Sequence, residues 1–174
     1  KLMPTEPLIQ KRGQVYIAHN AVVTGDVTMG KDTNIWYGCV IRGDIEPITL
    51  GERVNIQDLS MVHCDVGVPL VIENDVVAGH RVILHGSTIR SGALIGMGAV
   101  LLKECDIGEQ AIVGAGSVVP PGMKVPPRMV VMGVPAKVIR EVSDEEVEDI
   151  RSITQRYLNL AQAHAAGRYE EYQG

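Results

Sequence analysis

Aromatic side chains are scarce in this sequence of 174 residues. It has no phenylalanine and one tryptophan, and aromatic residues make up 3% of the chain, although 45% of its residues are hydrophobic. A core without large rings has to be filled by Val, Ile, Leu and Ala. Branched and small side chains of this kind suit a narrow, repetitive interior in which one side chain fills each layer.

Several other features are weak or missing. The net charge is −5, so the chain lacks the excess of Lys and Arg that holds nucleic acid. No apolar run is long enough to span a bilayer, and Lys1–Gln10 lacks the apolar centre of a signal peptide. The three cysteines, Cys39, Cys64 and Cys105, are far apart and form no CxxC pair. We therefore expect a cytoplasmic protein that binds neither nucleic acid nor membranes.

Aliphatic residues recur at every sixth position over much of the chain. The longest series is Val77, Ile83, Ile89, Ile95, Leu101, Ile107, Val113, Val119 and Val125. Small residues follow in the same step: Ser87, Ala93, Ala99, Cys105, Ala111 and Ser117. An earlier series, offset by two residues, is Val15, Ala21, Val27, Thr33, Cys39 and Ile45. The offset predicts an interruption of the repeat between Ile45 and Val77.

A period of six residues belongs to neither a helix nor a simple hairpin. It is typical of hexapeptide solenoids, in which six residues form one short strand and its corner. Three faces then close one coil of about 18 residues, so residues 13–125 would form about six coils of a parallel β-helix. The sequence thus predicts a mainly β fold with a single repetitive core.

The C-terminal part of the sequence changes character. Pro120-Pro121-Gly122 and Pro126-Pro127 cannot continue a strand ladder, so we expect the coils to end there and residues 126–142 to connect to a helix. Ser143 to Glu146 is a capping box, and apolar residues then recur at helical spacing. The sequence predicts a helix over residues 143–166, packed along the prism, within one domain spanning residues 1–174.

Three of the five histidines, His63, His80 and His85, lie where the repeat is interrupted. Three imidazoles with an open fourth position are typical of a catalytic zinc site. On extended backbone the Cα atoms of His80 and His85 could lie roughly 16 Å apart, and two imidazoles sharing an ion with bonds of about 2 Å hardly span more than roughly 12 Å. A corner between them would shorten this gap, but a site between subunits is the simpler solution. His63 and His80 are separated by nearly one full coil, which predicts similar positions in adjacent coils.

Three blocks of the sequence carry a family resemblance: Asn34 to Asp44, Asn55 to Asp58 followed by His63, and Gly79 to Gly86. They resemble the hallmark segments of the γ-class carbonic anhydrases, a family that includes proteins labelled ferripyochelin-binding. The resemblance implies a left-handed β-helix and a homotrimer with a metal site between adjacent subunits. It implies that His63 and His85 come from one chain and His80 from its neighbour. The implied metal is Zn²⁺, and imidazole ligands also accept Fe²⁺ or Co²⁺.

The same resemblance implies the chemistry of the site. A metal-bound hydroxide would hydrate CO2 reversibly to bicarbonate. Arg42 and Asp44 would form an ion pair that helps to join subunits, and Gln57 would orient the hydroxide or CO2, with Asp58 beside it. In the helix, Tyr157 and Asn159 match a Tyr-x-Asn pair that lines the family's pocket.

The sequence departs from the archaeal branch of the family at two places. Cys64 to Pro69 stand where that branch has an acidic loop after the first ligand. Ile45 stands where the archaeal branch has a glutamate that carries the proton away, and Glu46 and Asp65 are the substitutes at hand.

Two other functions remain open on the sequence. A hexapeptide acyltransferase shares the prism, and Gly133 to Lys137 resembles a segment at the end of its coils. Such an enzyme uses one histidine as a general base and an acyl-CoA donor, and the set of three histidines speaks against it. A relative that binds metal or a siderophore with low activity is the second alternative.

Overall fold

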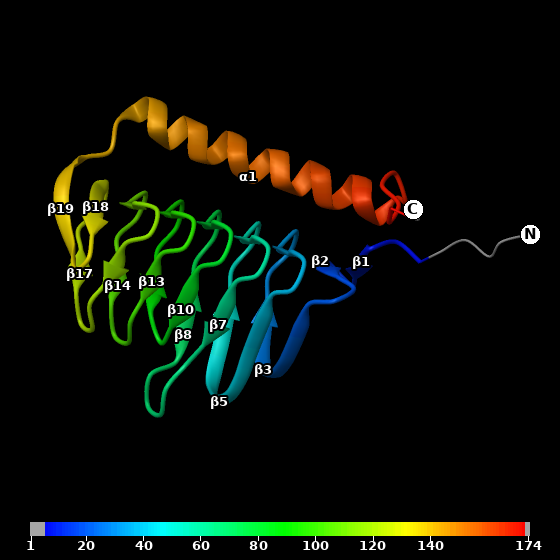
Figure 1. The fold of residues 1–174 in the computed structure, drawn as a ribbon, viewed down its shortest axis with the longest axis horizontal. Helices are drawn as coiled ribbons and strands as arrows, with labels where there is room; N and C mark the ends of the chain where they lie inside the picture. Colours follow the sequence, from blue (N-terminus) through cyan, green and yellow to red (C-terminus); the bar gives the residue numbers. More distant parts are fainter. Residues whose placement is uncertain (1–5, 173–174) are drawn as a thin grey trace, which may run out of the picture.

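The computed structural model describes residues 6–172 and shows a three-sided prism of stacked coils with one long helix along its side (Figure 1). This is the mainly β, left-handed parallel β-helix that the six-residue repeat and the family resemblance predict. The outermost parts of the predicted single domain, residues 1–5 and 173–174, lie outside the described residues.

The strands group into three faces. One sheet forms the helix face, which packs against the helix: β1 (Ile9–Arg12), β2 (Val15–Ala18), β4 (Asn34–Ile35), β6 (Asn55–Ile56), β9 (Val77–Ala78), β12 (Leu94–Ile95), β15 (Ile112–Val113), β18 (Met129–Gly133) and β19 (Ala136–Glu141).

The second sheet covers the other two faces because β3 (Val22–Met29) and β5 (Val40–Leu50) run through both. The first halves of β3 and β5 share one face with β7 (Met61–His63), β10 (Ile83–His85), β13 (Val100–Leu101) and β16 (Val118–Val119). Their second halves share the other with β8 (Leu70–Ile72), β11 (Thr88–Ile89), β14 (Asp106–Ile107) and β17 (Lys124–Val125).

Each short strand turns one aliphatic side chain into the prism. From Ile89 to Val125 the inward residues are those of the predicted series, and the small residues Ala93, Ala99 and Ala111 are fully buried as well. The series is wrong at its start: Ala78 and Leu84 point inward, whereas Ile83 is 43% exposed and Val77 packs outside. The reason is that Ile89 follows Leu84 after five positions, one fewer than the regular step.

The earlier series marks a second buried position in each repeat and is not a shifted copy of the aliphatic series. Thr33 and Cys39 are fully buried, but the aliphatic layer there is formed by residues two positions further on, such as Ile35 and Ile41. The offset of two residues therefore has a simple cause, because each six-residue unit buries a small residue just before its strand and a large residue within it. Ile45 does not belong to either position, since it is 45% exposed.

The register shows where the repeat is interrupted. The column of inward residues on the face of β7 and β10 is Val23, Ile41, Val62, Leu84, Leu101 and Val119. Relative to the regular coil, three residues are inserted after Ile41, four are inserted after Val62, and one is removed after Leu84. All three changes lie on the same corner of the prism.

The segment predicted as a connection, residues 126–142, is instead a hairpin. Strand β18 adds one more layer to the helix face by pairing with β15, and β19 pairs back onto it antiparallel. The prolines of 120–121 and 126–127 lie at corners, between β16, β17 and β18, so they do not end the coils. Proline is tolerated there because a corner residue need not donate to the ladder.

The helix α1 (Asp144–Ala165) matches the predicted one. Its capping box is complete: the Ser143 side chain accepts from the backbone N–H of Glu146, and the Glu146 side chain accepts from that of Ser143. Its apolar stripe packs against the helix face through Val147, Ile150 and Leu158. Over residues 6–172, no helix combines the length and apolarity needed to cross a membrane. The expected cytoplasmic location stays a prediction.

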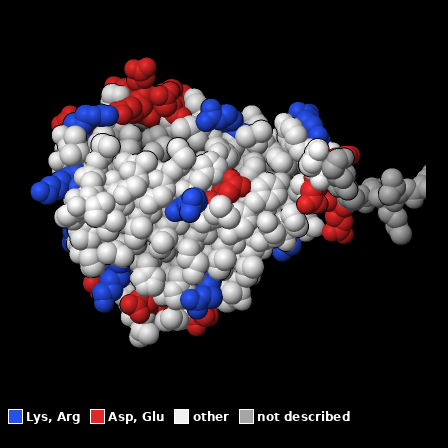
Figure 2. All heavy atoms as spheres, viewed as in Figure 1, with Lys and Arg blue, Asp and Glu red and all other residues white. Residues whose placement is uncertain are grey.

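The two faces without the helix differ in their outer side chains. On the face of β7, β10 and β13, which we call the aliphatic face, the outward residues are Val22, Val40, Met61, Ile83, Val100 and Val118. The corresponding residues on the third face are Thr28, Thr49, Val71, Thr88, Asp106 and Lys124. Figure 2 shows a broad surface over the coils with few charged side chains inside it and more at its rim.

Candidate metal centre

Two of the three predicted ligands lie side by side on one corner of the prism. Arg42, His63 and His85 occupy paired positions in β5, β7 and β10, immediately after the inward residues of the aliphatic face. The imidazoles of His63 and His85 lie with their ring centroids 5.5 Å apart and their planes tilted by 39°. This edge, where the coil lengths change, is called the histidine corner below. The insertions and the deletion therefore shape the surroundings of the two histidines.

Asp44 ties the histidine corner together. Its carboxylate accepts a hydrogen bond from the Arg42 guanidinium, and its other oxygen lies 3.1 Å from Nε2 of His63. The Arg42 hydrogen bond, more than that of His63, lowers the pKa of Asp44 below its ordinary value. The predicted ion pair thus exists and lies within one chain. Whether it also joins subunits stays a prediction.

The residues of this corner fit a divalent metal ion. Two imidazoles bound to one tetrahedral ion through bonds of about 2.0–2.1 Å have ring centres roughly 5 Å apart, close to the 5.5 Å between His63 and His85. Imidazole suits zinc, iron and cobalt alike. His63 and His85 are therefore placed as two of the three predicted ligands would have to be.

The third predicted ligand lies on a different corner. Tyr37, Asp58 and His80 each stand two residues beyond an inward residue of the helix face, so they stack in successive coils. Nδ1 of His80 is 2.8 Å from Asp58 Oδ2, and the backbone N–H of Tyr37 donates to Asp58 Oδ1. A carboxylate at one ring nitrogen fixes the tautomer and leaves the other nitrogen free to bind a metal. This edge is called the His80 corner.

A cleft of about 220 Å³ opens beside His80, between the helix and the coils. Gln57 and Tyr157 contribute to its wall, and Tyr157 Oη lies 3.3 Å from Nε2 of His80. Burial, and less strongly the carboxylate of Asp58, raises the pKa of Tyr157. Tyr157 is thus a neutral hydroxyl that can donate a hydrogen bond at the open nitrogen of His80.

A buried amide ladder under the helix fixes Gln57. Its side-chain N–H donates to Asn55, which donates to Asn34, and Asn34 also accepts from the indole of Trp36. Gln57 is 5% exposed, and Asn34 and Asn55 are almost fully buried. Satisfied buried networks hold their members in one orientation. In the sequence Asn34 and Asn55 stand out only as parts of the family blocks, because a hydrogen bond between successive coils has no local signal.

The two residues of the predicted Tyr-x-Asn pair lie on different sides of helix α1. Tyr157 faces His80, whereas Asn159 is exposed on the other side of α1, where its side chain accepts from Gln155. Residues two apart on a helix point in widely different directions. Within one chain Asn159 does not join the group around His80, and its place in the reaction stays a prediction.

The residues considered for proton transfer lie in the inserted segments. Ile45 is exposed, Glu46 accepts a hydrogen bond from the backbone N–H of Gly67, and Asp65 accepts from that of Val66. Both carboxylates therefore bind the backbone of the loop between β7 and β8. A further titratable pair was missed by sequence reasoning: Tyr37 Oη lies 3.0 Å from Nδ1 of His164, at the end of the helix. The two residues are too far apart in the sequence to give any local signal of this contact.

The three histidines do not meet in one chain. Across residues 6–172, no three His, Cys, Asp or Glu side chains come close enough to hold a metal ion. The prediction that His63 and His80 occupy similar positions in adjacent coils is wrong. The coil there is longer than a regular one, so His63 pairs with His85, and His80 belongs to the opposite edge of the aliphatic face.

The fold and these residues define a hexapeptide-repeat β-helix with an incomplete histidine site. The family model described as bacterial transferase hexapeptide (six repeats) matches residues 86–121. The chain is 45% identical to a carbonic anhydrase of Geobacillus kaustophilus, over 90% of this chain and 86% of that protein. It is 57% identical to the uncharacterized transferase YtoA of Bacillus subtilis, over 84% and 86% of the two chains.

A solved hexapeptide transferase family protein from Anaplasma phagocytophilum has the same fold, with a TM-score of 0.84 and 36% identity over 87% of this chain and 90% of that one. Names in this group thus include both transferases and carbonic anhydrases. The γ carbonic anhydrase 2 of Arabidopsis thaliana is 39% identical over 96% of this chain, which spans 62% of that longer protein. The chain belongs to the γ-class carbonic anhydrase family.

Proposed function

We propose that this protein hydrates CO2 reversibly to bicarbonate at a metal site that two copies of the chain build together. The observation that carries the proposal is the placement of the two half-sites. His63 and His85 lie on one edge of the aliphatic face, and His80 lies on the other. If this face packs against a second copy in a ring, the histidine corner of one chain meets the His80 corner of the next.

The aliphatic face supports the choice of a second copy as its partner. Its outward residues are all apolar, Val22 is 52% exposed, and Met97 and Leu59 at its edge are 59% and 63% exposed. A contiguous exposed apolar patch in a soluble domain marks an interaction surface. Heterologous contacts that return on themselves give closed rings, and a three-sided prism suits a ring of three. We therefore propose a homotrimer.

The chain's own residues would prepare the site in three ways. Asp58 fixes the tautomer of His80, and Asp44 with Arg42 holds His63. Gln57, held by Asn55, and the neutral hydroxyl of Tyr157 offer hydrogen bonds in the cleft where CO2 would lie. When bound by His63, His85 and His80 of the neighbouring copy, Zn²⁺ or alternatively Fe²⁺ or Co²⁺ would lower the pKa of water and supply the nucleophile near neutral pH.

The proposal is tested by loading the protein with zinc or iron(II) and measuring CO2 hydration by stopped flow. We expect hydration well above the uncatalysed rate, with up to one metal per chain and a trimer in sedimentation. Hydration at the background rate with full metal occupancy would contradict the proposed activity. It would favour the alternative of a metal- or siderophore-binding protein of low activity.

The second candidate function is acyl transfer from an acyl-CoA. The observation in its favour is the transferase naming of YtoA and of the Anaplasma phagocytophilum structure. Against it, three histidines and their orienting carboxylates exceed the single general base that such a reaction needs. Calorimetry with coenzyme A and metal analysis after gentle purification discriminate the two. A protein that binds coenzyme A and no divalent ion would support the transferase.

A further inference from the structure

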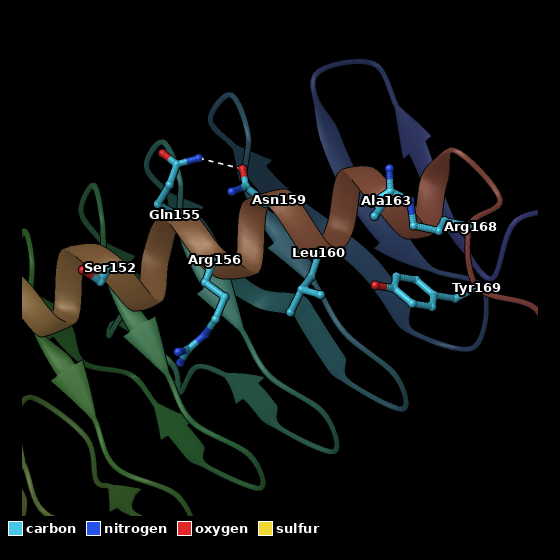
Figure 3. Close-up of a pocket in the computed structure, with 8 residues that line it drawn as sticks. All are labelled: Ser152, Gln155, Arg156, Asn159, Leu160, Ala163, Arg168 and Tyr169. Atoms are coloured by element: carbon cyan, nitrogen blue, oxygen red, sulfur yellow. Dashed lines mark hydrogen bonds between the residues drawn. The ribbon is translucent and has the colours of Figure 1, made fainter.

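The helix places a cationic side chain at the mouth of the His80 cleft. Arg156 lines that cleft together with Gln57, His80 and Tyr157, and it also lines an adjoining groove on the helix. In Figure 3 its side chain extends from α1 toward the coils, while Gln155 and Asn159 lie on the other side of the helix. Arg156 thus connects the cleft with the open surface.

The charge of Arg156 is not neutralised by a neighbour. Among residues 6–172, its guanidinium takes part in no ion pair and no side-chain hydrogen bond, unlike Arg151 on the same helix, which pairs with Glu148. Asp58, the carboxylate behind His80, is already bound to His80 and to the backbone of Tyr37. The donors of this guanidinium are therefore available to an anion.

The chemistry of the two reactants suggests which one Arg156 would recognise. CO2 is neutral and linear, whereas bicarbonate is a planar anion with two oxygens in the arrangement of a carboxylate. A guanidinium binds that arrangement through two parallel hydrogen bonds. In a chain with a net charge of −5, an unpaired cation at the cleft also provides local attraction for an anion.

We propose that Arg156 is the anion-binding residue of the cleft and holds bicarbonate as it leaves, or as it enters in the reverse direction. The inference rests on the proposed function and adds a residue that distinguishes the product from CO2. Arg156 is shared with the adjoining groove, which Arg168 lines as well. Arg156 is exposed, so its replacement leaves the fold intact.

The test uses ¹³C-labelled bicarbonate as the probe and metal-free protein, so that binding is measured without turnover. Transverse relaxation of the label is titrated with the native chain and with R156Q, R156K and R151Q. We expect R156Q to weaken binding roughly tenfold, as the loss of a charge-assisted contact does. R156K should lose less, because it keeps the charge without the planar fork. R151Q, which removes the same charge from the same helix away from the cleft, should bind like the native chain.

A second measurement follows the same residue in the zinc-loaded protein. The bicarbonate concentration that inhibits CO2 hydration should rise by a similar factor in R156Q and stay unchanged in R151Q. Native-like binding by R156Q, equal weakening by R151Q, or no binding by the native chain would each overturn the inference. Zinc-loaded native protein that binds bicarbonate through Arg156 but hydrates no CO2 would defeat the proposed function alone. Active protein whose R156Q variant binds bicarbonate normally would defeat the anion site alone.

Discussion

The coils from Ile89 to Val125 and the coils from Ile41 to Leu84 are built from the same six-residue repeat but differ in how constant their length is. The first group keeps the regular coil length, whereas the second is lengthened twice and then loses one residue. The position that carries Arg42, His63 and His85 in the irregular coils is taken by Leu102 and Pro120 in the regular ones. Regular coils thus supply a scaffold, and the candidate ligands stand where its period changes.

The comparison also explains what the transferase family model matches. It covers residues 86–121, which lie almost wholly within the regular coils and contain none of the candidate ligands. Members of a repeat class share the scaffold because each layer contacts only its neighbours. Function has to be argued from the site and not from the fold. The irregular coils therefore hold the information that separates a carbonic anhydrase-like site from an acyltransferase.

The largest effect is expected when a candidate ligand and the residue at the same position of a regular coil are replaced separately. His85→Ala should abolish metal binding and lower CO2 hydration by more than roughly a hundredfold, since a three-ligand site loses one ligand. Leu102→Ala changes the same position one coil later and should keep both metal and activity. Metal content by mass spectrometry and stopped-flow rates check this. Full metal occupancy in His85→Ala would show that the ligand assignment is wrong.

The regular coils should respond in stability and not in metal binding. Leu101 is fully buried, so Leu101→Ala should lower the free energy of unfolding by about 2–5 kcal/mol through a cavity in the core. Denaturant titration measures this, and the metal content of the folded variant should match that of the native protein. If Leu101→Ala lost metal but not stability, the regular coils would not be a mere scaffold for the site.

A smaller effect is expected at the residue that orients His80. Asp58→Asn should weaken zinc binding by roughly 10–100-fold, because the carboxylate holds the ring and its tautomer. Asp75→Asn is the control, since Asp75 pairs with Arg53 outside the candidate site. Competition with a zinc chelator gives both affinities. Equal affinities in the two variants would argue against a role of Asp58 in the site.

The smallest effect concerns the helix start. Hydrogen bonding to Arg140, followed by that to Ser143, lowers the pKa of Glu146 from its ordinary 4.5 to about 2. Its contribution to stability is therefore full above about pH 4.5 and is lost as the pH falls toward 2. Glu146→Gln should flatten this part of the stability–pH curve by less than about 1 kcal/mol, because the pair is partly exposed. A curve unchanged by Glu146→Gln would mean that these contacts add nothing in solution.

Local signals in the sequence predicted the fold well. The helix bounds follow from the capping box at Ser143 and from apolar residues at helical spacing, both of which act within a few residues. The six-residue series predicted the inward positions from Ile89 onward. It failed at Val77 and Ile83, because the deletion after Leu84 changes which residue points inward without disturbing the apolar pattern. The hairpin of β18 and β19 was missed because its pairing depends on the preceding coils.

The site was predictable only in part. Three sequence blocks indicated the residue types. The two-chain arrangement, suggested by the same blocks and by the distance between His80 and His85, stays a prediction. The resemblance implied that His63 and His85 act from one chain, whereas their spacing alone placed His63 with His80. The register of His63 with His85 depends on the true length of the coil between them, which an insertion after Val62 sets. The positions of Tyr157, Asn159 and Arg156 depend on how the helix lies against the coils, and that contact has no local signature.

In the proposed site no single chain supplies all three histidines. Mixing two variants that are each inactive tests this arrangement. His80→Ala lacks one half-site and His85→Ala lacks the other. The two proteins are unfolded together, refolded as a mixture and loaded with zinc. We expect each pure variant to be inactive and the mixture to regain metal and CO2 hydration, because each mixed trimer contains one intact pair of corners. A refolded mixture of trimers that stays metal-free and inactive would contradict a site shared between chains.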